Sequence, residues 1–406
     1  MRSIFHIDLN SFYASCEIVE SGGKYNFDSL IAVTGNPDAR CGIVLAASRP
    51  AKKFGIAAGM PLKEARDLCP DISFVKARFP LYFRMSNHVM SIIRQYSPLM
   101  ERYGIDEAFI DYTGCERLLG PPEQTAHVIR ERIKRETGLT VSIGVSYNKL
   151  LAKMGSDYKK PDAVTVITSD NLHSMIWPLP VKDLIFVGRR TAAKLCSMGI
   201  QTIGDLAAAP IQMLKDKFGI VGITLWMNAN GIDDEKVRSV QDPVKGIGNS
   251  STLPNDALTL DEINVMLLVH SEQVAKRLRE INKCCRTVQI HLKDSTLNSR
   301  QHQTTLQHPT DLTEDIYSAA SRLAAEIWSR EKVRQIGVRV TGLSDTTGFE
   351  QLTLFYEERH EKRRQLNICM DKLREKFGNN SIIRGTVLAE GLQNSIWYED
   401  VFMDRT

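Results

Sequence analysis

The opening stretch Ile4-Phe5-His6-Ile7-Asp8-Leu9 decides the fold of this chain, because it is short and almost continuously apolar. A run of this length and composition is typical of a buried strand. The stretch therefore predicts a strand with Asp8 at its C-terminal end, which places a carboxylate where the chain leaves the sheet.

Strand and helix patterns alternate between residues 100 and 167. Segment 139–146 alternates Leu, Val, Ile and Val with Thr, Ser, Gly and Ser, as a strand does. Pro121-Pro122 opens a helix with the apolar stripe Ala126, Ile129 and Ile133. The other predicted elements are strands over 100–105, 108–112 and 163–167 and a helix over 149–158. This order predicts an α+β sheet with helices on one face.

The remaining chain divides at two places. Trp177-Pro178-Leu179-Pro180 marks a boundary, after which residues 181–235 are expected to be helical with short loops. The polar stretch 238–248 predicts a linker. A third module is expected beyond it, with helices near 261–281 and 312–329 and strands near 287–293, 300–306 and 335–343.

The composition indicates a soluble globular protein. The 406 residues correspond to about 2.7 domains. The 52 basic and 48 acidic side chains give a net charge of +4, which permits a polyanionic partner without requiring one. The eight cysteines form no CxxC pair, so we expect reduced thiols in a cytoplasmic protein rather than a zinc site. No apolar run is long enough to predict a membrane span, and no secretory signal is expected, because Asp8 and Asn10 interrupt the first apolar stretch.

Carboxylates mark the candidate site. Asp8 ends one predicted strand, and Asp106 and Glu107 lie at the bend between two others. Carboxylates at neighbouring strand ends can hold a pair of divalent cations for phosphoryl transfer, and hard oxygen ligands favour magnesium or manganese. Adjacent strand residues point to opposite faces, so Asp106 and Glu107 share a site only if Gly104 bends the hairpin. The alternative is that all three are solvated turn acids.

Four motifs resemble those of the Y-family translesion DNA polymerases, with the bacterial polymerase IV and polymerase V branches the most similar. They occur in the family's order and cover about residues 1 to 350. The first is Asp8-Leu9-Asn10-Ser11-Phe12-Tyr13-Ala14-Ser15-Cys16-Glu17, and the others are Ala51-Lys52-Lys53-Phe54-Gly55-Ile56, Tyr103-Gly104-Ile105-Asp106-Glu107-Ala108-Phe109 and Lys160-Pro161.

The resemblance implies a right-hand polymerase fold with an added α/β little-finger domain. The expected palm covers 1–12 and 80–170, and the fingers cover 13–79. A helical thumb over 171–237 would carry a helix-hairpin-helix, and the linker would cover 238–248. The little finger is expected over 249–350 and a tail over 351–406.

The resemblance also implies the roles of site residues. Asp8, Asp106, Glu107 and the backbone carbonyl of Leu9 would hold two Mg2+ ions, with Mn2+ as a substitute. The nucleotide contacts would be Phe12, Tyr13, Arg49, Lys52 and Lys160. Tyr13 would exclude the ribose 2′-hydroxyl. The alternative for this ring is a core aromatic, for which Phe12 is the better candidate. Arg49, Ala46 and Gly104 depart from the family's usual residues.

Two regions resemble DNA-binding elements. Phe186-Val187-Gly188-Arg189-Arg190 is similar to a helix-hairpin-helix, although the family usually has glycine in place of Phe186. Gly188 and Arg189 would then contact phosphate, unless the segment is a simple turn between helices. Residues 276–300 hold seven basic side chains against two acidic ones. Lys245 and Arg286 could face phosphate from neighbouring strands, or belong to an ordinary charged surface.

The tail begins with Gln351-Leu352-Thr353-Leu354-Phe355, which resembles the peptide that binds the bacterial sliding clamp. Gln351 would make the polar contact, and Leu352, Leu354 and Phe355 would supply the apolar ones. The alternative is a final strand of the preceding domain. A helix with the stripe Leu366, Met370, Leu373 and Phe377 follows, which could pack on the body or dock a partner.

Three functions compete. The first is template-directed, low-fidelity DNA synthesis past damaged bases by a monomer that binds primer-template DNA and a deoxynucleoside triphosphate. The second is a non-catalytic, DNA-bound adaptor of the same fold that recruits the clamp; it would not need Asp8, Asp106 and Glu107. The third is a metal-dependent nuclease or phosphatase, which would have no use for Tyr13 or a clamp peptide.

Overall fold

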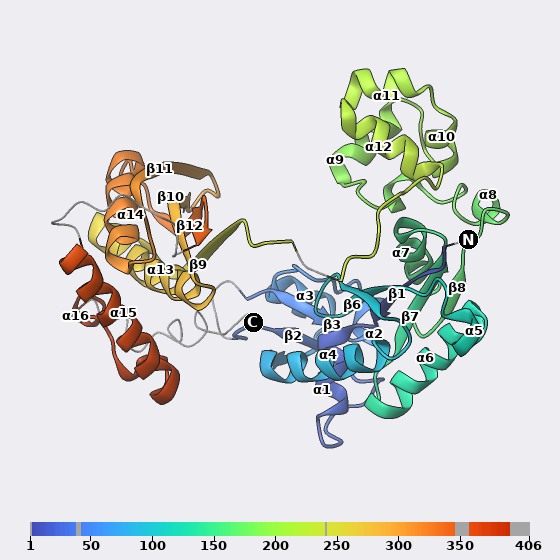
Figure 1. The fold of residues 1–406 in the computed structure, drawn as a ribbon, viewed down its shortest axis with the longest axis horizontal. Coiled ribbons are helices and arrows are strands. Elements are labelled where there is room, and N and C mark those ends of the chain that lie inside the picture. The colour runs from blue at the N-terminus through green and yellow to red at the C-terminus, as the bar shows by residue number, and fades with distance from the viewer. Residues whose placement is uncertain (1, 38–41, 240–241, 346–356, 390–406) are drawn as a thin grey trace. The chain divides into compact units, whose positions relative to one another are not determined.

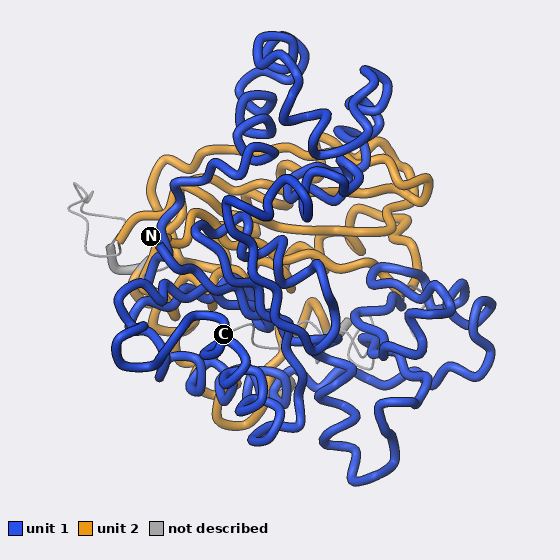
Figure 2. The backbone as a smooth tube through the Cα atoms, turned by 90° about the vertical axis from the view of Figure 1, so that its right-hand side faces the viewer, with its two compact units in different colours: residues 1–241 blue, residues 242–406 orange. Residues whose placement is uncertain are grey.

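The computed structural model describes residues 2–37, 42–239, 242–345 and 357–389 (Figure 1). The chain forms two compact units, Met1–Gln241 and Asp242–Thr406 (Figure 2).

Unit 1 is built on a five-stranded sheet in the order β5-β6-β1-β7-β8. The opening stretch forms the middle strand, β1 (Ile4–Leu9), and every residue of it is buried. It runs antiparallel to both neighbours, β6 (Glu107–Asp111) and β7 (Val141–Ser146). The edges are β5 (Leu99–Arg102), antiparallel to β6, and β8 (Val164–Val166), parallel to β7.

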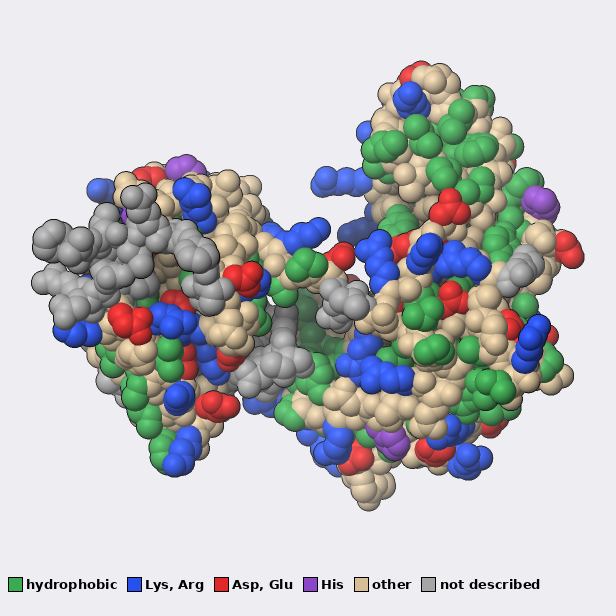
Figure 3. Space-filling model, in the orientation of Figure 1, with side chains coloured by type: hydrophobic (Ala, Val, Ile, Leu, Met, Phe, Trp, Pro, Cys, Tyr) green, Lys and Arg blue, Asp and Glu red, His purple; other side chains and the backbone are tan. Residues whose placement is uncertain are grey.

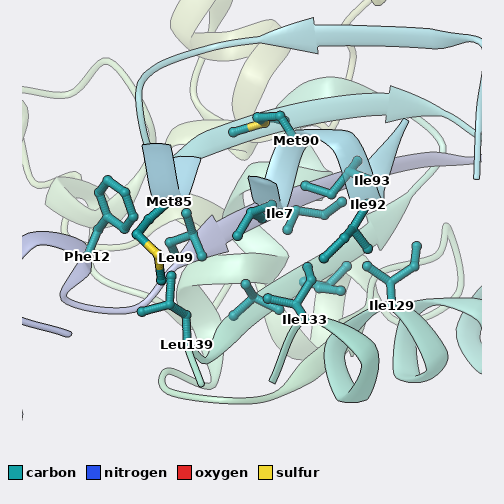
Figure 4. Close-up of a cluster of buried hydrophobic side chains, with 14 of the residues drawn as sticks. Ile7, Leu9, Phe12, Met85, Met90, Ile92, Ile93, Ile129, Ile133 and Leu139 are labelled. Atoms are coloured by element: carbon teal, nitrogen blue, oxygen red, sulfur yellow. The ribbon is translucent and has the colours of Figure 1, made fainter. Parts of the chain in front are cut away.

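Helices α4 (Phe79–Ile93) and α6 (Pro122–Thr137) cover one face of this sheet. Ile7 and Leu9 point into a closely packed apolar cluster with side chains of both helices, including Met85, Met90, Ile129 and Ile133 (Figure 4). Burying this many aliphatic side chains is the main stabilising contribution here, at roughly 2 kcal/mol for each.

Helix α7 (Lys149–Tyr158) packs on the other face, so the expectation of helices on one face was wrong. It comes so close that a Cβ at Gly144 of β7 would lie 1.8 Å from the carbonyl oxygen of Ala152. The small Gly144 and the small side chains of Ser142 and Ser146 make room for this helix. In the sequence these residues alternate with apolar ones as in a solvated strand face, which is why the second layer was missed.

A smaller sheet with the order β3-β2-β4 follows α1 (Phe12–Val19). Its strands are β2 (Ile31–Thr34), β3 (Val44–Ala47) and β4 (Ser73–Lys76), with β2 antiparallel to β3 and parallel to β4. Two short helices, α2 (Arg49–Lys53) and α3 (Leu62–Leu68), complete this part. The short α5 (Glu116–Leu119) lies between β6 and α6 of the larger sheet.

A helical module follows, and its core includes Leu151 and Met154 of α7. Its helices are α8 (Leu172–Met175), the 3-10 helix η1 (Val181–Asp183), α9 (Arg189–Ser197), α10 (Ile203–Ala208), α11 (Ile211–Phe218) and α12 (Ile220–Ala229). Hydrophobic side chains of α11 and α12 are exposed on its surface, as Figure 3 shows.

Unit 2 contains a four-stranded antiparallel sheet in the order β11-β10-β12-β9, packed against two helices. The strands are β9 (Gly246–Ala257), β10 (Lys283–Asp294), β11 (Ser299–Thr310) and β12 (Val333–Thr341), with the short β13 (Ser344–Asp345) on β10; the helices are α13 (Leu260–Glu280) and α14 (Thr313–Ile327). The sequence did not predict β9, because its residues are mostly polar and include two glycines and Pro254. Such a composition is tolerated at a sheet edge, where β9 lies.

The tail helix α15 (Glu357–Phe377) packs on α13, and it does so by a polar stripe. The buried residues of this stripe are Asn367 and Arg374, whereas Leu366 and Phe377 of the expected apolar stripe are exposed. The 3-10 helix η2 (Asn379–Ser381) and α16 (Gly385–Ala389) follow, and Val387 is buried against α13.

Candidate active site

The three predicted carboxylates come from adjacent elements of the large sheet. Asp8 and Glu107 are directly paired in the register of β1 and β6. The backbone N–H of Leu9 donates to the carbonyl oxygen of Asp106 at 3.0 Å, which places Asp106 beside the end of β1. Asp106 precedes β6, so strand alternation does not force it away from Glu107.

A tight turn produces this arrangement. The backbone N–H groups of Tyr103 and Gly104 both donate to the carbonyl oxygen of Glu107, at 3.0 and 3.3 Å. The chain thus reverses around Gly104, as the sequence argument required. A Cβ at this position would lie 3.5 Å from the Asp106 carboxylate, an ordinary contact, so a larger residue such as serine would also fit.

Two lysines neutralise the strand-end carboxylates. Lys160 lies 3.0 Å from Asp8 and 2.6 Å from Asp157. Lys153 of α7 lies 2.6 Å from Glu107, and the Nε2 atom of the buried His6 lies 3.4 Å from the same carboxylate. Lys153 and His6 were not predicted. His6 lies two residues before Asp8 on the same strand, which is the only signal that the sequence offers, because nothing in it shows that α7 brings Lys153 to Glu107.

The protonation equilibria reflect this crowding. Burial raises the pKa of Asp8 to about 7, with a further contribution from Glu107, although Lys160 opposes the change. Burial and the charge of Glu107 also raise the pKa of Asp106. Burial would raise the pKa of Glu107 too, but hydrogen bonds from His6 and Lys153 bring that pKa below its ordinary value. The three groups repel one another, and added positive charge would relieve this repulsion.

In the part of the chain that the structure describes, no three His, Cys, Asp or Glu side chains are already arranged to hold a metal ion. The donor set nevertheless fits a hard divalent cation, because it consists of carboxylate oxygens that already attract cationic groups. The ammonium groups of Lys160 and Lys153 supply that positive charge here.

Two further cations for which the sequence analysis expected nucleotide contacts, Arg49 and Lys52, belong to α2. Lys52 of α2 donates to the Ser11 hydroxyl at 2.9 Å. Burial lowers the pKa of Lys52, and so does the charge of Lys160, which places the two lysines in each other's field near Asp8. Arg49 is exposed at the first turn of α2, which the Ser48 side chain caps.

The two adjacent aromatics have different surroundings. The side chain of Phe12 is 3% exposed and lies in the core of the large sheet, so any nucleotide contact by this residue comes from its backbone. Tyr13 is half-buried. Its ring stacks on Tyr82 with centroids 4.5 Å apart, and the edge of Phe79 lies against it at 6.0 Å. These contacts fix the Tyr13 ring.

The predicted DNA contacts lie on exposed parts of both units. Gly188 is the N-cap of α9 and Arg189 is its first residue, but the element before them is the three-residue η1 rather than a full helix. Lys245 precedes β9 and Arg286 belongs to β10, and both are exposed. These strands are separated by β12, so the expectation of neighbouring strands was wrong, although both residues lie at the same end of the sheet.

The basic stretch 276–300 does not form one free cationic face. Arg279 pairs with Asp371 of the tail helix at 2.7 Å, and Lys283 pairs with Asp345 at 2.6 Å. Arg300 lies 2.8 Å from Glu331. These three basic side chains therefore already pair with acidic side chains of the protein, although the sequence suggested that the stretch faces DNA.

Two expectations concern other parts of the chain. The segment Gln351 to Phe355 lies outside the described residues. Among the described helices, none has the length and apolar character that crossing a membrane would require.

Family models match most of the chain. Residues 7–157 match the impB/mucB/samB family, and residues 244–354 match its C-terminal domain. Residues 182–233 match the thumb domain of DNA polymerase-iota.

Curated relatives are similar over nearly the whole length. DNA polymerase IV of Acetivibrio thermocellus is 41% identical over 399 residues, covering 97% of this chain and 100% of the relative. DNA polymerase IV 2 of Bacillus subtilis is 38% identical over 395 residues, covering 95% of each chain. The chain belongs to this family, the Y-family of DNA polymerases, and the family depends on divalent metal ions.

The fold agrees with solved structures. A Y-family DNA polymerase chimera of Dbh and Dpo4 matches with a TM-score of 0.73 at 23% identity, covering 84% of this chain and 99% of that one. DinB from Sulfolobus solfataricus matches with a TM-score of 0.55 at 24% identity, covering 84% of this chain and 98% of that one. The right-hand polymerase architecture expected from the sequence is thereby confirmed.

Proposed function

We propose that this protein carries out template-directed, low-fidelity DNA synthesis past damaged bases. The primer 3′-hydroxyl attacks the α-phosphate of a bound deoxynucleoside triphosphate, and pyrophosphate leaves. The observation that carries the proposal is the pairing of Asp8 with Glu107 across β1 and β6, with Asp106 held beside Leu9. This is a compact anionic site within a chain of the polymerase family.

The acidic residues act by binding divalent cations. Asp8, Asp106, Glu107 and the carbonyl oxygen of Leu9 would hold two Mg2+ ions, for which Mn2+ can substitute. When bound, these ions activate the attacking hydroxyl and stabilise charge on the transferred phosphoryl group. The protein fixes the donor atoms beforehand, through the strand register and the turn at Gly104.

The triphosphate is bound by three cationic side chains, Lys52, Lys160 and Arg49. Lys160 lies close enough to Lys52 for its positive charge to lower the pKa of Lys52. Binding of an anion between the two ammonium groups is therefore favoured. Their positive charge neutralises the departing pyrophosphate, which is the main demand that phosphoryl transfer makes on a protein. The backbone of Phe12, at the start of α1, contributes a further contact.

Tyr13 selects the sugar. Its ring is held by Tyr82 and Phe79, so it cannot move aside for an added 2′-oxygen. A fixed steric barrier of this kind discriminates without a polar contact.

Palm, fingers and thumb are assigned to 1–12 with 80–170, to 13–79 and to 171–237. The linker, little finger and tail are assigned to 238–248, 249–350 and 351–406. Gly188, Arg189, Lys245 and Arg286 contact phosphates without reading bases, which suits a polymerase that accepts any template. The protein is assigned as a cytoplasmic monomer that binds the sliding clamp through Gln351, Leu352, Leu354 and Phe355.

Primer extension separates this function from its competitors. With Mg2+ and all four deoxynucleotides, the protein should extend a primer and insert a nucleotide opposite an abasic site. A DNA-bound adaptor would bind the same substrate without extending it, and a nuclease would shorten it. Chelation of the metal should stop extension.

Clamp binding has its own test. Deletion of residues 351–355 should abolish the increase in processivity that added clamp produces, while extension without clamp stays unchanged. Clamp stimulation that survives the deletion would remove this peptide from the proposal.

A further inference from the structure

Phe186 has an unusual combination of backbone and side-chain positions. It lies in the turn between η1 and α9 with a φ of 73°, in the left-handed region that favours glycine. Its side chain is 72% exposed, so the ring does not stabilise the module by burial. If this residue served only to form the turn, glycine would be more favourable, because it adopts a positive φ without steric strain.

Neighbouring residues hold this conformation. Leu184 and Val187, on either side in the chain, are buried in the core of the helical module. The backbone N–H of Val187 donates to the carbonyl oxygen of Leu184 at 3.0 Å and closes the turn. Because the flanking side chains are anchored inward, the backbone at Phe186 is fixed and its ring projects outward.

Exposed cationic side chains lie close to Phe186 along the chain. Arg189 and Arg190 are exposed in the first turn of α9, and neither forms an ion pair within the described part of the chain. Lys182 is also exposed in η1, beside the acidic Asp183. An exposed aromatic ring with exposed arginines three and four residues further along the chain matches the chemistry of a nucleic-acid surface, where cations contact phosphates and the ring contacts sugars or bases.

We propose that Phe186 is a DNA-contacting residue that packs on the sugars or base edges of duplex DNA while Arg189 and Arg190 contact its phosphates. This inference rests on the proposed function for its partner, the primer-template duplex. It adds a nonpolar contact to a surface that was otherwise expected to act through charge. A neutral ring releases no counterions, so its contribution to affinity is independent of salt concentration.

The test measures binding of the full-length protein to a fluorescent primer-template duplex over a range of salt concentrations. Phe186→Ala should weaken binding roughly tenfold, the scale of removing one aromatic ring from a nucleic-acid surface, and leave the slope of log K against log salt unchanged. The double variant Arg189→Ala/Arg190→Ala should instead reduce that slope by about 0.9 for each phosphate that is no longer neutralised. Phe27→Ala is the matched control, because Phe27 is also an exposed phenylalanine, at 51%, and lies outside the helical module; its binding should be unchanged.

Phe186→Gly separates a structural role from a binding role. Glycine relieves the backbone conformation, so this variant should be at least as resistant to thermal unfolding as the parent, yet should bind DNA as weakly as Phe186→Ala. Binding by both variants within twofold of the parent would overturn the inference. If the parent extends primers in that case, the proposed function stands and only the role of Phe186 fails.

Discussion

Asp8 and Glu107 face each other across two antiparallel strands, yet each carboxylate pairs with a different lysine. Lys160 lies 3.0 Å from Asp8, and Lys153 lies 2.6 Å from Glu107. One lysine follows α7 and the other belongs to it, so a single helix and its exit bring both cations to the ends of two strands. Two of the three carboxylates therefore each have a cationic partner before any ligand binds.

Lys160 provides the first prediction. Its ammonium group lies beside Asp8 and within the field of Lys52, where we place the triphosphate. Lys160→Ala should raise the KM for the incoming nucleotide about tenfold or more, since a hydrogen bond between charged groups is removed. Single-nucleotide insertion kinetics measure this change. The exposed neighbour Lys159 is the control, and an equal effect of Lys159→Ala would indicate loss of general surface charge instead.

Tyr13 provides the second prediction. Tyr13→Ala removes the ring that Tyr82 supports, so incorporation of ribonucleotides relative to deoxynucleotides should rise by roughly tenfold to a hundredfold, the range for removing one steric barrier. Competing insertion of the two nucleotides measures the ratio. Tyr13→Phe keeps the ring and should keep the selectivity. Unchanged selectivity in the alanine variant would assign the barrier to another residue.

The sequence predicted the catalytic sheet well, because its signals are local. The apolar run at Ile4 to Leu9 predicted Asp8 at a strand end, and the bend at Gly104 predicted Glu107 between two strands; the structure places the two residues opposite each other on adjacent strands. The cations were harder to predict, because Lys153 reaches Glu107 from a helix on the face that the pattern left uncovered. No local pattern shows which helix packs on which face.

His270 provides the third prediction, on the pH dependence of unit 2. It is fully buried in α13, with Asn249 and Ser251 of β9 at 3.1 and 3.0 Å from its two ring nitrogens. Burial lowers the pKa of His270 to about 4 from 6.5. Between pH 6.5 and pH 4, His270 is protonated in the unfolded chain but neutral in the folded protein. The free energy of unfolding is therefore at its full value above pH 6.5 and falls as the pH drops towards 4.

The contribution of His270 to this loss is at most about 3 kcal/mol, from 1.36 kcal/mol for each pKa unit. Hydrogen exchange of α13 amides at pH 7 and pH 5 measures the change. His270→Gln should reduce the difference between the two pH values. An equal difference in both proteins would assign it to other groups.

Glu272 provides the fourth prediction. Its carboxylate is buried in α13 and lies 3.3 Å from Arg374 of α15 and 2.7 Å from Arg384. Glu272→Gln leaves the buried Arg374 without its counter-charge and leaves Arg384 paired with Glu314 alone, which should destabilise the docked tail by about 3 kcal/mol. Amide exchange in α15 should then accelerate, whereas the exposed Glu375→Gln should have little effect. Unchanged exchange in the first variant would show that the tail is held by other contacts.

The tail also shows where pattern reading failed. The stripe Leu366 to Phe377 reads as an apolar face, yet the helix docks through Asn367 and Arg374. The partners of these residues, Thr313 and Glu272, are polar side chains far away in the sequence. Periodicity predicts burial of apolar faces and cannot predict a polar interface whose other half is distant.

The most direct test of the account is primer extension by Asp106→Asn, measured beside DNA affinity. The substitution keeps the shape of the side chain and removes only its charge, so primer-template binding should stay within about twofold of the parent. Extension should fall by roughly a thousandfold or more, because charge stabilisation in the transition state is removed. Extension at the parent's rate with Mg2+ present would contradict the claim that Asp8, Asp106 and Glu107 act together in nucleotidyl transfer.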